Sequence, residues 1–229
     1  MVSKPNKGDT NWDVSLNAAL DDLQGQITTN GASIATNSSS ITSVSGRVTT
    51  LEAVPATTPA KAGIVSWTYD PVFGSAGTAL PTGNVHMQRF DLPASATVTN
   101  ILIGISVAGA TLTAGQNFAG LYNSSGTLLA QTADQTSAWG GTGLITMPLT
   151  AAQSLTAGTY YTALLTNGTT GPTVLRGLSL SALANVVNLG FTATNARWAT
   201  SGSGLTSLPG SVTMSSRTIQ GTTWWIGLS

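Results

Sequence analysis

The side chains that could act as acids, bases or nucleophilic partners are few and scattered along this chain. It contains eight carboxylates, a single imidazole at His86 and no cysteine. A serine hydrolase triad would have to use His86, but the sequence has no Gly-x-Ser-x-Gly turn to present a nucleophile. Residues 177–181 (GLSLS) are only superficially close to such a turn. Since His86 lies within a predicted strand, we interpret it as a structural residue and expect no catalytic residue.

Metal binding is also poorly supported by the residue types and their spacing. The absence of cysteine excludes thiolate sites, and one histidine excludes a histidine cluster. A calcium site could use Asp70, Asp91 or Asp134 with loop carbonyls, but no spacing matches a calcium-binding loop. Glycosidase chemistry needs two carboxyl groups about 5–10 Å apart, and Asp91 with Asp134 is one pair that could meet. We predict no metal, no cofactor and no enzymatic activity.

Aromatic residues in polar loops indicate a different chemistry, the binding of sugars. Pyranose rings stack on exposed aromatic faces, while amides and carboxylates hold their hydroxyls. Trp139 and Trp198 lie near Gly-, Ser- and Thr-rich stretches, and Asp134, Asn195 and Arg197 are near them in sequence. These five residues form the candidate glycan-binding set. The alternative is that both tryptophans cap the hydrophobic core beneath loops.

The low charge limits the classes of partner. Asp, Glu, Lys and Arg make up 7% of the residues, where about a quarter is usual, and the net charge is zero. The basic residues are too few and too scattered for nucleic acid, and no apolar run reaches membrane-spanning length, so we expect no membrane insertion. A surface of hydroxyls and amides is typical of proteins that work outside cells. Because residues 1–9 are not a signal peptide, we expect delivery by cell lysis, as in a virus particle.

The elements that must position these residues begin with a heptad repeat near the N-terminus. Its a positions are Leu20, Ile27, Ile34, Ile41 and Val48, and its d positions are Leu16, Leu23, Asn30, Asn37, Val44 and Leu51. As a helix this seam would span roughly 54 Å. A single helix cannot bury such a seam, so the repeat predicts a coiled coil between chains. The alternative is one amphipathic helix packed against a globular core.

Two details of the repeat favour a homotrimer. Arg47 at g and Glu52 at the following e can form an ion pair between neighbouring helices, within the short Arg-hydrophobic-x-x-hydrophobic-Glu pattern of trimeric coiled coils. Asn30 and Asn37 at successive d positions can point their amides at an anion or water on the threefold axis. This arrangement resembles the stalks of trimeric bacterial adhesins. The alternative is that these asparagines only set the register.

Beyond the helix the pattern changes to that of a β-rich domain. A capping box at residues 10–13 predicts the helix start, and Pro55 and Pro59 predict its end. From residue 64 on, runs of β-branched and aromatic residues alternate with Gly- and Asn-containing turns. The predicted strands are 84–92, 97–107, 117–122, 127–132, 143–149, 159–166, 188–194 and 224–228, with one short helix within 178–189. Trp224 and Trp225 alternate, so we expect one to face the core and the other to pack between subunits.

These signals define the predicted fold class, which is mainly β, with a jelly-roll-like β-sandwich after a trimeric helical coiled coil. The expected parts are an extended virion anchor at 1–12, a coiled-coil stalk at 13–54, a linker at 55–63 and a β-sandwich head at 64–229.

Several segments carry a resemblance to a known class of proteins. Residues 92–101 (LPASATVTNI), 112–129 (LTAGQNFAGLYNSSGTLL) and 155–161 (LTAGTYY) resemble β-rich domains of bacteriophage minor tail proteins and fibres. Residues 8–12 (GDTNW) and 16–20 (LNAAL) resemble the start of such proteins in phages of actinobacteria. The resemblance implies a virion protein, anchored by its N-terminus, that displays a C-terminal head, and it assigns no site residues.

Two functions follow as expectations. The first is a phage fibre that adheres to a glycan of the host surface through trivalent heads. The second is a capsid head fibre or decoration protein that is anchored by residues 1–12 and has no dedicated receptor pocket.

Overall fold

The computed structural model describes residues 12–53 and 58–229, with side chains described at 14–48 and, except at 76, 178 and 181, at 58–229. The chain divides into two compact units, Met1–Ala56 and Thr57–Ser229. The predicted anchor at 1–12 and the capping box at 10–13 lie outside the described side chains, as does part of the predicted linker.

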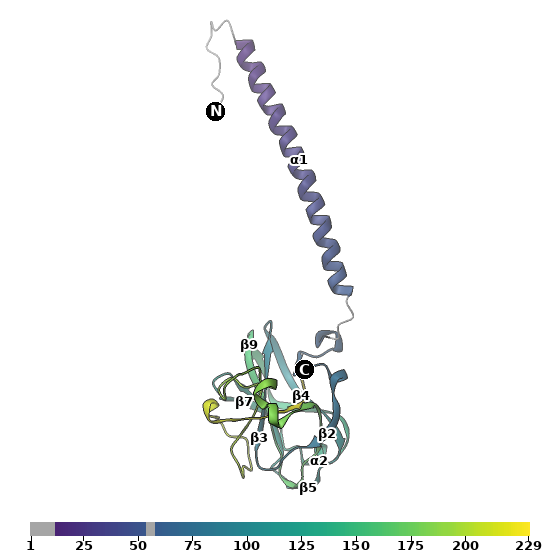
Figure 1. The fold of residues 1–229 in the computed structure, drawn as a ribbon, viewed down its shortest axis with the longest axis vertical. Helices are drawn as coiled ribbons and strands as arrows, with labels where there is room; N and C mark the ends of the chain where they lie inside the picture. Colours follow the sequence, from purple (N-terminus) through teal and green to yellow (C-terminus); the bar gives the residue numbers. More distant parts are fainter. Residues whose placement is uncertain (1–11, 54–57) are drawn as a thin grey trace. The chain divides into compact units, whose positions relative to one another are not determined.

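The described part of the first unit is one helix, α1 (Trp12–Ala53), of 42 residues (Figure 1). Its limits agree with the predicted ones within one or two residues. Many of its residues are poor helix formers, but their hydroxyls are satisfied within the helix. Thr28, Thr36 and Ser39, among others, donate to the carbonyl four residues earlier at 2.9–3.1 Å. The helix surface is therefore polar although it has few charged groups.

The second unit is a mainly antiparallel β-sandwich of two sheets (Figure 1). The strands of the seven-stranded sheet are β1 (Ser66–Trp67), β2 (Ser75–Ala79), β4 (Ala96–Val107), β8 (Gly143–Leu155), β11 (Thr173–Ser179), β14 (Thr222–Trp224) and β15 (Ile226–Leu228). The strands of the six-stranded sheet are β3 (Val85–Leu92), β6 (Phe118–Asn123), β7 (Leu128–Gln131), β9 (Gly158–Leu165), β12 (Trp198–Ser201) and β13 (Thr218–Ile219). A separate ribbon pairs β5 (Ala110–Leu112) with β10 (Gly168–Thr170).

The strand order explains which segments become neighbours. The first sheet runs β1-β15-β4-β11-β14, with β2 also paired to β11 and β8 to β4. The second sheet runs β13-β12-β3-β9-β6-β7. In the second sheet β3 lies between β9 and β12, so residues near 90, 160 and 198 are brought side by side.

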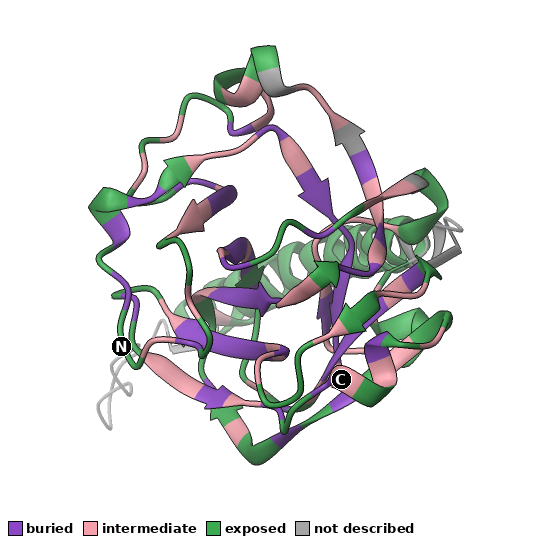
Figure 2. Ribbon diagram, turned by 90° about the horizontal axis from the view of Figure 1, so that it is seen from below, coloured by how far each residue is buried: buried purple, intermediate pink, exposed green. Residues whose placement is uncertain are grey.

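The main core lies between the two sheets, and the buried residues are drawn in purple in Figure 2. Strand β4 contributes Ile101, Ile103 and Ile105, which are at most 3% exposed. These three side chains share one face of the strand, because successive side chains of a strand point to opposite faces, whereas Val107 at the end of the strand is 58% exposed. Each buried aliphatic side chain of this size contributes about 1.5–3 kcal/mol to stability.

A second cluster covers the other face of the six-stranded sheet. Val85, Met87 and Tyr161 pack there against Leu208 and Met214 from the irregular segment before β13. Because β3 is covered on both faces, its side chains are nearly all buried and show no simple alternation.

One predicted strand is wrong. Residues 188–194 form a loop that follows the turns η3 (Ser181–Leu183) and α3 (Ala184–Val187), and the next strand is β12. These two turns account for the short helix predicted within 178–189. The remaining helical turns are η1 (Ala60–Ala62), η2 (Pro71–Phe73), α2 (Thr136–Trp139) and η4 (Met214–Ser216). The predicted strands also omitted β2 and β11, which pair with each other.

Candidate functional site

The heptad seam of α1 is exposed in the single chain. The described apolar seam residues, each between 45% and 69% exposed, are Leu16, Leu20, Leu23, Ile27, Ile34, Ile41, Val44 and Val48. In Figure 2 the helix is green, the colour of exposed residues, over nearly all of its described length. Such a continuous row of exposed aliphatic side chains makes the seam the first candidate functional surface of the chain.

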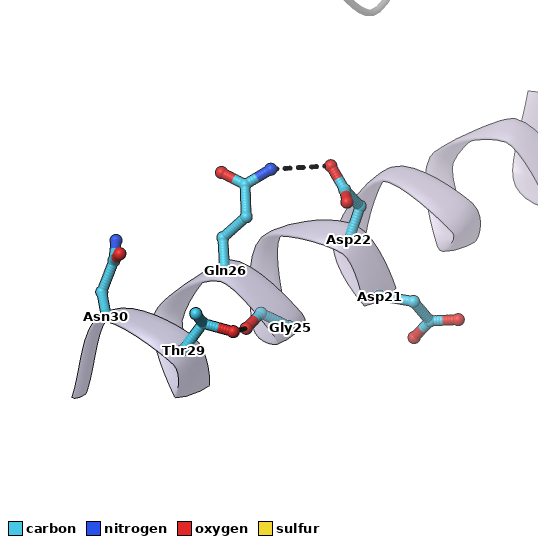
Figure 3. Close-up of a pocket in the computed structure, with 6 residues that line it drawn as sticks. All are labelled: Asp21, Asp22, Gly25, Gln26, Thr29 and Asn30. Atoms are coloured by element: carbon cyan, nitrogen blue, oxygen red, sulfur yellow. Dashed lines mark hydrogen bonds between the residues drawn. The ribbon is translucent and has the colours of Figure 1, made fainter. Parts of the chain in front are cut away.

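The polar positions of the seam lack partners within the chain. In the described residues, the side chains of Asn30 and Asn37 make no hydrogen bond. Figure 3 shows Asn30 beside Thr29, whose hydroxyl donates to the Gly25 carbonyl at 2.9 Å, and Gln26 Nε2 donates to Asp22 Oδ2 at 2.8 Å. The Arg47–Glu52 ion pair stays a prediction, because the Glu52 side chain, like that of Leu51, lies outside the described residues.

The structure assigns the five glycan candidates to two different surroundings. Trp139 is fully buried in the main core, and its Nε1 donates to Met147 Sδ at 3.2 Å. Asp134 accepts a hydrogen bond from the Asn117 backbone N–H at 3.1 Å. Burial acts to raise the pKa of Asp134, but hydrogen bonds from Gly115 and neighbouring groups outweigh it and lower that pKa. Trp139 therefore offers no exposed ring for a sugar, which corrects that expectation, and Asp134 stabilises a turn.

Arg197 lines a cleft of about 360 Å³ in the sandwich. The lining residues are Trp67, Thr68, Arg89, Phe90, Asp91, Leu189, Phe191 and Arg197. They come from β1 and the residue that follows it, from β3 and from the loop between α3 and β12. Asn195, the fourth candidate, borders this group, because its carbonyl accepts a hydrogen bond from Arg89 Nη1 at 3.5 Å.

Arg89 is held firmly within this cleft. Its Nη2 lies 3.0 Å from Asp91 Oδ1 and 3.3 Å from the Thr159 hydroxyl, and its Nε lies 3.3 Å from the same carboxylate oxygen. Thr159 also donates to Asp91 Oδ1. The Arg89 guanidinium carbon lies 5.2 Å from the centre of the Phe191 ring, close enough for a cation–π contact.

The Arg197 guanidinium has fewer polar contacts within the protein than that of Arg89. Its guanidinium carbon lies 4.3 Å from the centre of the Trp198 ring, and its side chain makes no hydrogen bond within the described residues. Burial lowers the pKa of Arg197, and the positive charge of Arg89 lowers it further, while Asp91 acts in the opposite direction. The guanidinium stays charged but lacks a hydrogen-bonded anion of its own.

A second cleft, of about 280 Å³, adjoins Arg197. Its lining residues are Tyr69, Phe73, Gly177, Arg197, Trp198 and Thr223. Phe73 is 76% exposed, and Asp70 caps its helical turn by accepting from the Val72 N–H at 2.9 Å. Trp198 is only 5% exposed and its buried Nε1 has no partner in the described residues. Arg197 thus borders two clefts that both contain aromatic side chains.

The loop that carries Phe191 is fixed at both ends. The fully buried Asn188 donates to the Ala184 and Gln220 carbonyls at 2.8 and 2.9 Å and accepts from the Trp198 N–H at 2.9 Å. Arg217 donates to the Ala193 carbonyl from Nη2 at 2.7 Å, and also to that of Thr194 at 3.0 Å. These anchors position the loop as a wall of the cleft.

Sequence reasoning identified Arg197 and Asn195 but missed Arg89, Asp91 and Phe191 as members of this site. One signal was available, because Arg89 and Asp91 are two residues apart on a predicted strand and therefore share a face. The strand pairing that places β3 beside β12 has no local signal of this kind.

An apolar groove of about 370 Å³ also lies on the sandwich and shares Trp67 with the first cleft. Its lining residues are Ala62, Ile64, Trp67, Pro71, Leu102, Gly104, Leu144, Leu175 and Trp225. Trp224 belongs to the main core, but Trp225 is buried as well, at 5% exposed, so the expected division into one core-facing and one outward tryptophan is not observed in the single chain. Packing of Trp225 between subunits stays a prediction.

Catalysis by His86 and the binding of a metal ion have little support in the described ranges. His86 is 5% exposed, with Nε2 3.3 Å from the Pro81 carbonyl, and burial lowers its pKa to about 4. Within residues 12–53 and 58–229, no group of three or more His, Cys, Asp or Glu side chains could hold a metal ion. None of the helices in these ranges has the length and hydropathy needed to span a bilayer.

Comparison with known proteins assigns no family. No protein-family model matches this chain, and no curated protein matches it. Any function must therefore be argued from the exposed seam and the two clefts around Arg197.

Proposed function

We propose that this chain is a homotrimeric bacteriophage virion fibre whose β-sandwich heads adhere to the host surface. The observation that carries the proposal is the exposed seam of α1. The helix extends for 42 residues, and nothing in the described part of its own unit covers its exposed aliphatic seam. Isolated helices of such composition are marginal in water, and burial of the seam between chains supplies the missing stability.

The polar seam positions support three strands. Asn30 and Asn37 have side-chain amides without partners in the described chain, so three copies can converge on one axial anion or water at each level. Arg47 is exposed and lies at a g position, where an ion pair to Glu52 of a neighbouring chain would form. These contacts would set the register and the number of chains.

The head supplies the adhesive part of the proposal. A jelly-roll-like head with aromatic side chains around a guanidinium has the chemistry of a sugar-binding surface. Three heads on one stalk would convert weak individual contacts into strong attachment through avidity. The resemblance of residues 92–101 and 112–129 to minor tail proteins and fibres supports a place on the virion, with residues 1–12 as its anchor.

Sedimentation equilibrium tests the assembly. The expected mass is three times the 23.1 kDa of one chain. A single-chain mass at micromolar concentration would overturn the fibre.

Fluorescently labelled protein tests adhesion. It should bind cells of the phage's host, and excess unlabelled protein should block adsorption of the phage. Antibody-labelled virions in electron micrographs should show the protein on the tail. Label on the capsid, together with no binding to cells, would instead establish a head fibre or decoration protein.

A further inference from the structure

The charges around Arg197 are concentrated to an unusual degree. Lysine and arginine together number eight in 229 residues, yet Arg89 and Arg197 line the same cleft. Arg89 is neutralised by Asp91 at 3.0 Å, whereas Arg197 has no hydrogen-bonded carboxylate in the described chain. The cleft therefore has one uncompensated positive charge, partly buried, beside a second guanidinium.

A bound anion would remove the electrostatic cost of this arrangement. A guanidinium presents its donors in a planar fork that matches the two oxygens of a carboxylate. The Arg197 guanidinium carbon lies 4.3 Å from the centre of the Trp198 ring, and this cation–π contact restrains the guanidinium before any ligand arrives. A preorganised guanidinium loses less side-chain freedom when it binds.

The remaining lining suits a sugar ring rather than a small inorganic anion. Trp67 and Phe191 line one cleft, and Tyr69 and Phe73 line the other. Such rings stack on the C–H faces of pyranoses. The hydrogen bonds that Asp91 accepts all end at Oδ1, which leaves Oδ2 as an acceptor for a sugar hydroxyl.

We propose that the two clefts around Arg197 bind an acidic saccharide, with a uronic acid carboxylate paired to the Arg197 guanidinium. The single positive charge of Arg197, which has no hydrogen-bonded carboxylate in the described chain, matches the single negative charge of a carboxylate. A phosphorylated sugar fits less well, because its second negative charge would remain uncompensated near Asp91. The assignment rests on the proposed function as an adhesin and names the chemistry of its receptor.

A matched pair of sugars tests the carboxylate. Methyl β-D-glucuronide and methyl β-D-glucoside differ only at C6, and both can be titrated into the full-length protein while its NMR spectrum is recorded. The glucuronide should bind at least tenfold more tightly. Equal affinities, or tighter binding of methyl β-D-glucoside 6-phosphate, would overturn the proposal.

Matched variants test the residue. Arg197→Gln should abolish the preference for the glucuronide, and Arg197→Lys, which keeps the charge but loses the fork, should retain part of it. Lys61→Gln removes the same charge from an exposed turn outside both clefts and should leave the preference unchanged. Spectra of each variant without sugar verify the fold. An unchanged preference in a folded Arg197→Gln protein would exclude Arg197 as the carboxylate partner.

The outcomes separate this inference from the fibre itself. A trimer that adsorbs to cells but does not bind the glucuronide would overturn only the ligand. A single-chain protein that binds the glucuronide through Arg197 would overturn the fibre and leave the ligand site intact.

Discussion

Ile34 in helix α1 is 69% exposed, whereas Ile103 in strand β4 is fully buried. The same side chain thus has opposite surroundings in the two units of one molecule. In the sandwich, the two sheets and their connections bury each other's apolar faces, so the unit supplies its own core. In the helix, the apolar face has no counterpart within the described part of its own unit. The comparison indicates that the head has a core of its own, whereas the proposed stalk would gain one only by association.

The most direct test of this difference between the helix and the sandwich is to place charges in the seam. Ile34→Lys combined with Ile41→Lys would bring six like charges together in a trimer, and the stalk should dissociate and lose its helical signal. The head should keep its own melting transition, because its main core consists of residues of the sandwich. Sedimentation and far-UV circular dichroism measure the first effect, and calorimetry measures the second. A variant that remained trimeric would contradict the assigned register.

The complementary experiment damages only the head. Trp139→Ala removes a fully buried ring from the main core and should lower the free energy of unfolding of the head by about 3–5 kcal/mol. Leu144→Ala is a suitable control, because Leu144 is 64% exposed and its loss should cost little. Urea unfolding followed by near-UV circular dichroism gives both values. Trimer formation should persist in both variants, and its loss would mean that the head also drives assembly.

Acid should also act on the head and leave the seam unaffected. Burial lowers the pKa of His86 from 6.5 to about 4, so the folded head binds fewer protons than the unfolded chain between these values. Stability of the head should therefore fall as the pH falls through this window, by about 3 kcal/mol in total. His86→Gln should flatten this part of the pH profile. An equally steep profile in the variant would assign the acid sensitivity to carboxylates.

The features that the sequence could predict are those that follow from local periodicity. The limits of α1 and the burial of Ile101, Ile103 and Ile105 follow from local periodicity, since a heptad and a two-residue alternation can be read directly from the chain. The predicted strand at 188–194 failed because Asn188 satisfies distant backbone groups with its side chain. No local pattern shows that an asparagine will replace a strand ladder in this way.

The candidate site was predictable only in part, for a related reason. Arg197 was identified because it is adjacent to Trp198 in sequence. Arg89 joins it through the pairing of β3 with β12, and Trp67 comes from β1, which belongs to the other sheet. Phe191 lies on the same loop as Arg197, and the course of that loop depends on hydrogen bonds from Asn188 and Arg217. Burial of Trp139 could not be predicted from the sequence either, because a tryptophan beside a glycine-rich turn can be exposed or buried.

Replacement of a glycine by alanine should change stability the least of these substitutions, and the sign of the change should differ between the helix and the head. Gly25 occupies the outward f position of the heptad, and an added Cβ would meet nothing within 4 Å. Gly25→Ala should stabilise the stalk by about 1 kcal/mol per chain, because alanine loses less backbone entropy on forming a helix. Gly126 in the head has φ +88°, and a Cβ there would lie 2.1 Å from the Val212 carbonyl oxygen.

The same replacement at Gly126 should therefore destabilise the head by about 1–3 kcal/mol. Thermal unfolding of the two variants, at equal protein concentration, should give shifts of opposite sign. Destabilisation of the stalk by Gly25→Ala would place that residue inside a helix contact and would shift the assigned heptad frame. The sign of one small substitution thus reports which face of α1 is turned toward its partners.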